Sequence, residues 1–224
     1  MIRAVLFDMD GVLLDTETIG ERVLLGLLRE RGYDADASFY RSVLGIPNDE
    51  AAAVYRARFG ADFPYEEVLA QFLNVFYNMC VTGDVPRKDG LLECVTALKA
   101  RGLKLALATS TVRPLVKDYF ATMPEVDACF DAMVCGGEVA NGKPAPDVYV
   151  AAAKAVGCSP AECVGVEDSF SGVRSIRASG AYCVMIPDLL PFGERFAPYV
   201  DAHLTSLREL PALIDRLNSA DGRA

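Results

Sequence analysis

The stretch MIRAVLFDMDGVLLD, residues 1–15, decides the fold and supplies the first candidate site residues. Its apolar run, residues 4–7, predicts a buried strand from the centre of a parallel sheet. Asp8 and Asp10 follow at once, and because residues two apart in a strand point the same way, their carboxylates should lie side by side. Like charges this close in a partly dry site repel each other unless a proton or a cation intervenes. The stretch therefore predicts a site that needs a positive group from elsewhere in the chain.

Composition restricts the class of protein. With 224 residues, 52% of them hydrophobic, the chain can bury a sizeable core as one large domain or as a core with an insertion. A formal net charge of −9 argues against nucleic acid and anionic membranes as partners, but not against a small anionic substrate. No segment approaches the roughly 18 apolar residues of a membrane span, and Asp8 and Asp10 interrupt the first apolar run, so no signal peptide is predicted.

The cysteines and the single histidine carry no recognisable site. The seven cysteines are Cys80, Cys94, Cys129, Cys135, Cys158, Cys163 and Cys183. They are odd in number and form no CxxC pair, and several sit in apolar runs, which predicts reduced core residues of a cytoplasmic protein. His203 is expected at the surface or at a strand edge, without a catalytic role.

Residues 16–85 have a helical pattern. The segments ERVLLGLLRERG (21–32), NDEAAAVYRARFG (48–60) and YEEVLAQFLNVFYNM (65–79) repeat apolar residues at spacings of three and four, and Gly32 and Gly60 follow as stop signals. No strand is predicted among them. We therefore expect an all-helical block inserted after the first strand.

From Pro86 onward, strands and helices alternate. Strands are expected at 103–110, 131–137, 162–169 and 181–186, and helices at 90–102, 113–123, 146–157, 171–180 and 208–217. Such alternation predicts an α/β fold: a Rossmann-like parallel sheet covered by helices on both faces, which the first strand joins. The expected domains are an α/β core, residues 1–15 and 86–224, and an inserted helical domain, residues 16–85.

Polar residues gather where the predicted strands end. In open α/β sheets the ligand site lies beyond the carboxyl ends of the strands. The residues expected at this edge are Asp8, Asp10, Thr109, Ser110, Thr111, Lys143, Glu167 and Asp168. Taken singly, these residues could be helix caps or a solvated loop lysine, but their expected position together at one edge of the sheet favours a functional site.

The chemistry of this set is that of phosphoryl transfer. Four acids cannot all stay ionised without a cation, and Mg²⁺ binds one or two carboxylates together with waters and a substrate phosphate. Lys143 adds a second positive charge, and Thr109 adds a hydroxyl donor. One aspartate can then attack phosphorus, and the other can protonate the leaving oxygen and later activate water.

Four strings resemble the signature motifs of the haloacid dehalogenase-like superfamily: FDMDGVLLDTE, LALATS, GKPAPD and GVEDSFSGV. The closest subfamily is that of β-phosphoglucomutase and its sugar-phosphate phosphatase relatives. The resemblance implies that Asp8 is the nucleophile and Asp10 the general acid/base. It also implies that Thr109 binds phosphate, that Lys143 stabilises the charge of the transition state, and that residues 16–85 form the family's cap domain.

The same resemblance implies a Mg²⁺ site. Asp8 and Asp168 are the expected ligands, with Glu167 beside them as a direct ligand or a supporting group. In the family the backbone carbonyl of Asp10, rather than its side chain, usually reaches the metal.

Departures from the family's branches favour a phosphatase. Phosphonate cleavage needs a cap lysine, and the chain has none before Lys88. Dehalogenases do not need the second aspartate, and signalling receiver domains are shorter and lack such a helical insertion. Mutases use a cap histidine and a cap arginine where this chain has Gly20 and Asn48, so a β-phosphoglucomutase-like mutase is the alternative to a phosphatase.

The substrate is expected to be a small polar phosphorylated metabolite, such as a sugar or polyol phosphate. Contacts with its leaving group are predicted at Glu17 and in the turn LGIPND (44–49), through Gly45 and Asn48. No oligomeric state is predicted.

Overall fold

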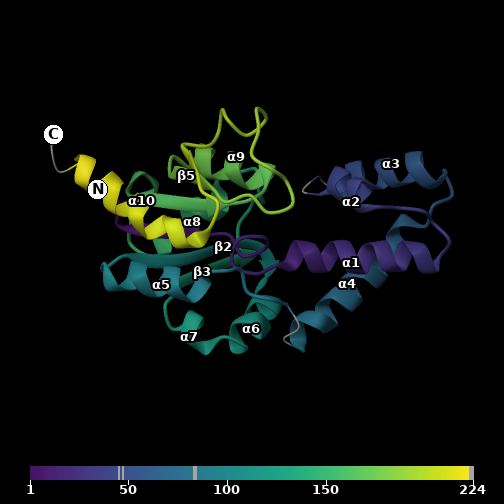
Figure 1. Ribbon diagram of the computed structural model, residues 1–224, viewed down its shortest axis with the longest axis horizontal. Helices are drawn as coiled ribbons and strands as arrows, with labels where there is room; N and C mark the ends of the chain where they lie inside the picture. The colour runs from purple at the N-terminus through teal and green to yellow at the C-terminus, as the bar shows by residue number, and fades with distance from the viewer. Residues whose placement is uncertain (45, 47, 83–84, 222–224) are drawn as a thin grey trace.

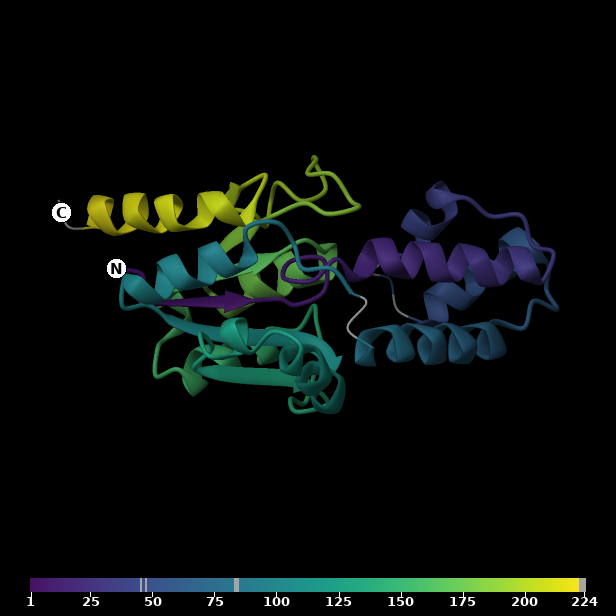
Figure 2. The same ribbon diagram turned by 60° about the horizontal axis from the view of Figure 1, so that its bottom comes forward.

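The computed structural model describes residues 1–44, 46, 48–82 and 85–221 and shows two lobes (Figure 1). One lobe contains a sheet with helices around it, and the other contains helices α1 to α4, as both views show (Figure 2). The chain enters the helical lobe directly after its first strand and returns from it before α5 (Leu91–Ala100).

The sheet has six strands in the order β3-β2-β1-β4-β5-β6, and every neighbouring pair is parallel. Their bounds are β1 Ala4–Phe7, β2 Lys104–Val112, β3 Ala132–Gly136, β4 Cys163–Glu167, β5 Tyr182–Met185 and β6 Ala202–His203. β1 lies between β2 and β4, so the strand order reverses there. This is where a doubly wound sheet opens a crevice for a ligand.

Helices cover both faces of the sheet. The remaining core helices are α6 Arg113–Ala121, α7 Pro124–Asp127, α8 Asp147–Ala155, α9 Phe170–Ser179 and α10 Leu210–Asp221. Val5 and Phe7 of β1 belong to one buried cluster, and Ala4 and Leu6 belong to the other, on the opposite face. The period of two along β1 thus places one strand in two hydrophobic cores, and the predicted α/β fold is confirmed.

The helical lobe consists of α1 Thr16–Glu30, α2 Ala37–Val43, α3 Asn48–Phe59 and α4 Tyr65–Val81. It has a buried cluster of its own, which includes Phe39, Tyr55 and Phe63. The sequence pattern did not show α2, which begins where the Asp36 carboxylate accepts hydrogen bonds from the backbone N–H groups of Ser38 and Phe39. The division into core and cap domains stays a prediction.

The remaining predictions concern cysteines, histidine and membrane spans. The six cysteines whose side chains the structure describes, all but Cys80, are free thiols. His203 lies in the edge strand β6 and stacks on Phe192, with the ring centres 4.4 Å apart. Among the described helices, none is both long enough and apolar enough to cross a bilayer.

Candidate active site at the carboxyl ends of the strands

Lys143 connects two carboxylates from neighbouring strands. Asp8 follows β1 and Glu167 ends β4, and the Lys143 ammonium donates a hydrogen bond of 2.6 Å to each of them. All three side chains are at least nine-tenths buried. Although burial opposes its charge, the two carboxylates raise the pKa of Lys143 above its ordinary value. The lysine therefore stays charged at the centre of the site.

Glu167 is held by donors on both of its oxygens. Oε1 also accepts from the Tyr149 hydroxyl at 3.1 Å, and Oε2 accepts from the backbone N–H groups of the next two residues and from the Ser169 hydroxyl. Burial opposes ionisation, but Lys143 and these hydrogen bonds lower the pKa of Glu167. A Cβ at Gly172 would lie 1.8 Å from the Glu167 carboxyl, so only glycine leaves room for it.

Asp168 is the carboxylate that lacks a donor. It is buried, and in the described part of the chain no group donates a hydrogen bond to its side-chain oxygens. Oxygens of Asp8, Glu167 and Asp168 lie within 4.8 Å of one another. Burial and the two neighbouring carboxylates raise the pKa of Asp168 well above its ordinary value.

This arrangement fits a divalent cation. Three buried carboxylates with one ammonium leave excess negative charge, which a hard ion with oxygen ligands would neutralise. Glu167 belongs to the oxygen cluster by distance, yet five donors already occupy its oxygens. Asp8 and Asp168 are therefore the carboxylates best placed to act as ligands.

Asp10 points its carboxylate toward a different partner. Its Oδ2 accepts a hydrogen bond of 2.7 Å from the Thr111 hydroxyl, and its side chain lies outside the three-carboxylate cluster. Burial raises the pKa of Asp10, although hydroxyl donors oppose the shift. A raised pKa favours the protonated form, which a proton donor needs.

Thr109 and Ser110, predicted to bind substrate, differ in position. Thr109 is buried in β2, and its hydroxyl oxygen accepts from the backbone N–H of Thr111, which leaves its own proton free to donate. Ser110 is exposed, and its hydroxyl makes no hydrogen bond with any described residue. The structure thus buries the first hydroxyl at the sheet edge and exposes the second.

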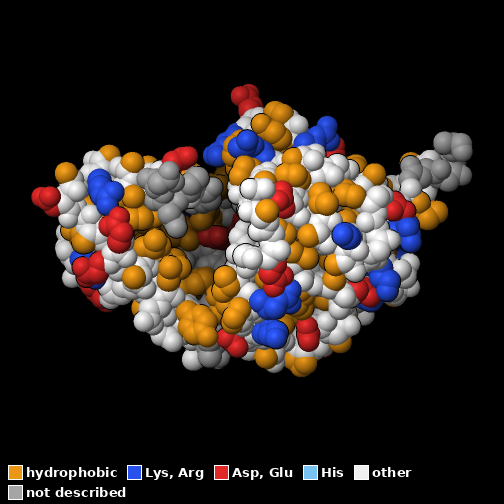
Figure 3. Space-filling model, turned by 180° about the vertical axis from the view of Figure 1, so that it is seen from behind, with side chains coloured by type: hydrophobic (Ala, Val, Ile, Leu, Met, Phe, Trp, Pro, Cys, Tyr) orange, Lys and Arg blue, Asp and Glu red, His pale blue; other side chains and the backbone are white. Residues whose placement is uncertain are grey.

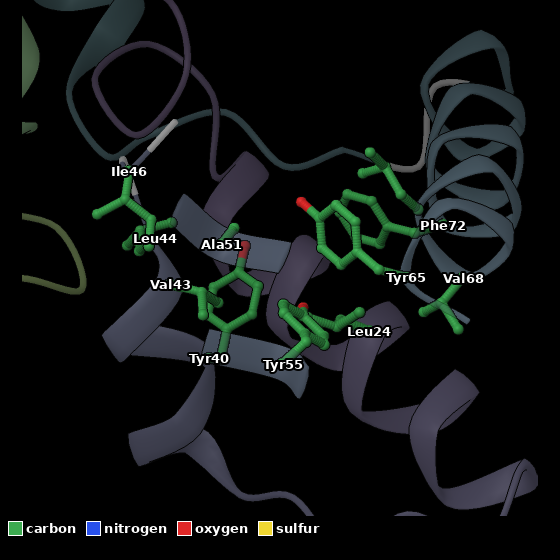
Figure 4. Close-up of a pocket in the computed structure, with 11 residues that line it drawn as sticks. Leu24, Tyr40, Val43, Leu44, Ile46, Ala51, Tyr55, Tyr65, Val68 and Phe72 are labelled. Atoms are coloured by element: carbon green, nitrogen blue, oxygen red, sulfur yellow. The ribbon is translucent and has the colours of Figure 1, made fainter. Parts of the chain in front are cut away.

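The helical lobe reaches this edge through Glu17. The Glu17 carboxylate accepts a hydrogen bond of 2.9 Å from the Tyr40 hydroxyl, and burial raises the pKa of Glu17 to about 7. Tyr40 also lines a cavity of about 150 Å³ between the helices of the helical lobe, together with Leu44 and Ile46 of the predicted turn (Figure 4). A Cβ at Gly20 would lie 2.4 Å from the Tyr40 hydroxyl oxygen.

Two further substrate contacts were predicted at Gly45 and Asn48. Gly45 lies outside the described residues, and Asn48 is the first residue of α3. Conversely, sequence reasoning missed Tyr40 and Tyr149, which hold Glu17 and Glu167. Both tyrosines lie inside helices rather than at strand ends, so no motif pointed to them.

Comparison with known proteins identifies the family of this chain. The family model of haloacid dehalogenase-like hydrolases matches residues 2–180. Protein CbbY of Rhodobacter capsulatus is 32% identical over 206 residues, which cover 88% of this chain and 90% of that protein. Hexitol phosphatase B of Escherichia coli K12 is 28% identical over 214 residues, 94% of this chain and 95% of the phosphatase. The crystal structure of CbbY from Rhodobacter sphaeroides in complex with phosphate has a TM-score of 0.75 at 28% identity and covers 94% of this chain and 96% of that one.

Proposed function

The chain belongs to the haloacid dehalogenase-like hydrolases, and we propose that it is a Mg²⁺-dependent phosphatase. Its substrate would be a small phosphorylated metabolite, a sugar or polyol phosphate, hydrolysed through an aspartyl-phosphate intermediate. The observation that carries this proposal is the Lys143 ammonium, which bridges Asp8 and Glu167 beside the donor-free carboxylate of Asp168. The name of hexitol phosphatase B, a relative along nearly the whole chain, supports the substrate class.

The proposed reaction has two steps. Asp8 attacks the phosphorus atom, the bond to the leaving oxygen breaks, and Asp10 gives its proton to that oxygen. Asp10 then takes a proton from a water molecule whose oxygen attacks the phosphorus of the aspartyl phosphate, which releases phosphate and restores Asp8. Lys143 and the Thr109 hydroxyl hold the phosphoryl oxygens as their negative charge grows.

Asp8 and Asp168 would hold the metal ion, together with the backbone carbonyl of Asp10. The ion supplies positive charge that neutralises the phosphoryl oxygens and the surplus carboxylate charge of the site. Glu167 acts in this scheme through Lys143, whose ammonium it holds against Asp8. Catalysis would then depend on charge placement more than on proton transfer alone.

The contact between Tyr40 and Glu17 supports hydrolysis over the mutase alternative. Mutases of the resembled subfamily carry a histidine at the position of Gly20. Here even a Cβ at that position would collide with the Tyr40 hydroxyl. The space that such a histidine needs is therefore filled by the tyrosine that bonds Glu17.

Residues 16–85 would act as a cap that admits substrate and then excludes water, with residues 1–15 and 86–224 as the catalytic core. Glu17 and the turn at 44–49 would contact the leaving group. The acidic net charge and the free cysteines support a cytoplasmic protein that acts on a small molecule rather than on nucleic acid or membrane.

The test is phosphate release from p-nitrophenyl phosphate, with Mg²⁺ and then with a chelator. We expect metal-dependent turnover in the wild type and a loss of about 10³-fold or more in Asp8→Asn. Asp127→Asn is the matched control, because it makes the same change at an exposed position on α7. Turnover that survives Asp8→Asn, or that ignores the chelator, would overturn the proposal.

A further inference from the structure

A second cavity lies between the two lobes, beside the catalytic lysine. It has a volume of about 650 Å³, within the range of metabolite pockets. Ile46 and Glu50 line it from the helical lobe, and Lys143 lines it from the segment between β3 and α8. Arg174 and Arg195 complete the wall on the core side. One cavity therefore joins the catalytic edge to two arginines.

The two arginines converge on one aromatic ring. Arg174 lies in α9 and Arg195 in the segment between β5 and β6, and their Cζ atoms lie 5.6 and 3.8 Å from the centre of the Phe170 ring. Stacking of a guanidinium on an aromatic face holds its plane while its N–H groups stay free for a ligand. One phenyl ring thus positions both guanidinium groups.

Neither arginine has a carboxylate partner within the described part of the chain. The contrast with Arg177 is direct, because that residue lies one turn after Arg174 on the same helix and pairs with Asp201 at 3.0 Å. In a chain of net charge −9, unpaired cations that share a cavity are unusual and would attract an anion. Figure 3 shows Lys and Arg side chains gathered at the rim of the hollow between the lobes.

The described charges that face this cavity leave it positive. Among the side chains that the structure describes, Glu50 is the one acidic group that lines it, against Arg174 and Arg195. The charge of Lys143 is already balanced by Asp8 and Glu167, so Lys143 adds no net positive charge to that of the two arginines. A ligand with an anionic end would therefore gain by reaching past the catalytic lysine toward the arginines.

We propose that Arg174 and Arg195 bind a second anionic group of the substrate, a phosphate or a carboxylate at the end remote from the scissile phosphate. This inference rests on the proposed phosphatase function and narrows it to bisphosphates and phosphorylated acids. Arginine forks suit such groups because they donate two parallel hydrogen bonds to one oxyanion.

A matched set of polyol substrates tests the proposal. D-mannitol 1,6-bisphosphate has two equivalent phosphates, and D-mannitol 1-phosphate lacks the second. 6-Phosphogluconate carries a carboxylate in place of the second phosphate and also differs in configuration at C2. We expect kcat/KM for the bisphosphate to exceed that for the monophosphate by about tenfold, beyond the statistical advantage of two phosphates. A preference that extends to 6-phosphogluconate identifies any oxyanion as the ligand, and one confined to the bisphosphate identifies phosphate.

The variant Arg174→Gln/Arg195→Gln should remove most of this preference, chiefly by raising KM for the bisphosphate. Arg216→Gln makes the same substitution at an exposed arginine of α10 that has no ion-pair partner among the described residues, and this control should retain the preference. The preference should also fall as salt rises, because the pair is exposed.

The possible failures are distinguishable. Hydrolysis of all three substrates without a preference, or a preference that the double variant retains, would overturn the arginine site and leave the phosphatase proposal intact. Absence of Mg²⁺-dependent phosphate release from every substrate would overturn the phosphatase proposal, and the arginine site with it.

Discussion

Replacing Lys143 with methionine should destabilise the fold by about 3 kcal/mol at neutral pH, because it leaves buried negative charge without a partner. The ammonium lies 2.6 Å from both Asp8 and Glu167, and its side chain is 6% exposed. Glu167 would keep the Tyr149 hydroxyl and its other donors. The Asp8 side chain would keep no hydrogen-bond donor among the described residues, so its unpaired charge accounts for most of the lost stability. This places the loss at the lower end of the usual range for a broken buried ion pair.

The loss should depend on pH in a defined direction. In the wild type, the carboxylates outweigh burial and raise the pKa of Lys143, so its contribution is fully present below the ordinary lysine pKa of about 10.4 and is lost only above it. Without the ammonium, burial holds the folded-state pKa of Asp8 further above its unfolded value. The variant then keeps its stability at low pH and loses it as pH rises through the folded pKa. The deficit is therefore larger at pH 8 than at pH 5.

Urea unfolding at both pH values, with and without Mg²⁺, measures this deficit. Mg²⁺ should stabilise both proteins, by about 2.7 kcal/mol at 100 times Kd, and it should narrow the deficit at pH 8 because the unpaired Asp8 charge of the variant favours tighter binding of the ion. Lys154→Met is the matched control, because Lys154 is exposed on α8 and its loss should change stability by less than about 0.5 kcal/mol. A deficit equal at the two pH values, or no larger than that of the control, would refute this account of the charge balance.

Three further predictions concern single positions. Gly11→Ala should weaken Mg²⁺ binding by about tenfold or more in calorimetry. Gly11 has φ 75°, which is strained for alanine, and the new Cβ would lie 2.4 Å from Asp168 Oδ2, so the carboxylate proposed to bind the ion would have to move. Gly26→Ala, which meets open space in α1, is its control and should bind normally. Asp10→Asn should lose about 10²–10⁴-fold in turnover yet keep its affinity for Mg²⁺, and loss of metal binding would contradict the assigned role. Glu17 has a folded pKa of about 7, so its stabilising contribution is complete below its ordinary pKa and is lost as pH rises through 7. Glu17→Gln should therefore gain about 2–3 kcal/mol relative to wild type between pH 5 and pH 8 in urea unfolding, whereas a constant difference would contradict the shift.

The main elements of the fold could be predicted because their sequence patterns are long or unambiguous. The apolar run of β1 is buried throughout, and β2, expected at 103–110, spans Lys104–Val112. Two short helices were missed, α2 with seven residues and α7 with four. Elements of one or two turns show too little periodicity to be recognised, and caps and packing stabilise them instead.

The candidate site was predictable to the extent that its residues follow strands. Asp8 and Glu167 lie at the ends of paired central strands, where the parallel register brings them to one edge. A loop motif predicted Lys143 as a site residue, but only the fold shows that its ammonium bridges Asp8 and Glu167. Tyr149 lies inside α8, and its contact with Glu167 depends on how that helix packs on the sheet. Such a contact has no signature in the linear sequence.

The same division explains why the reaction is easier to infer than the substrate. The charged groups of the reaction centre are fixed by a buried sheet with helices on both faces, so packing determines their positions. The groups proposed to select the substrate lie on the helical lobe, on α9 and on the segment that carries Arg195, where side-chain identity matters more than backbone geometry. Relatives can therefore share one sheet edge and one chemistry while their cavities differ. In this chain, the arginines on Phe170 and the tyrosine opposite Gly20 are the features that would set its choice of substrate.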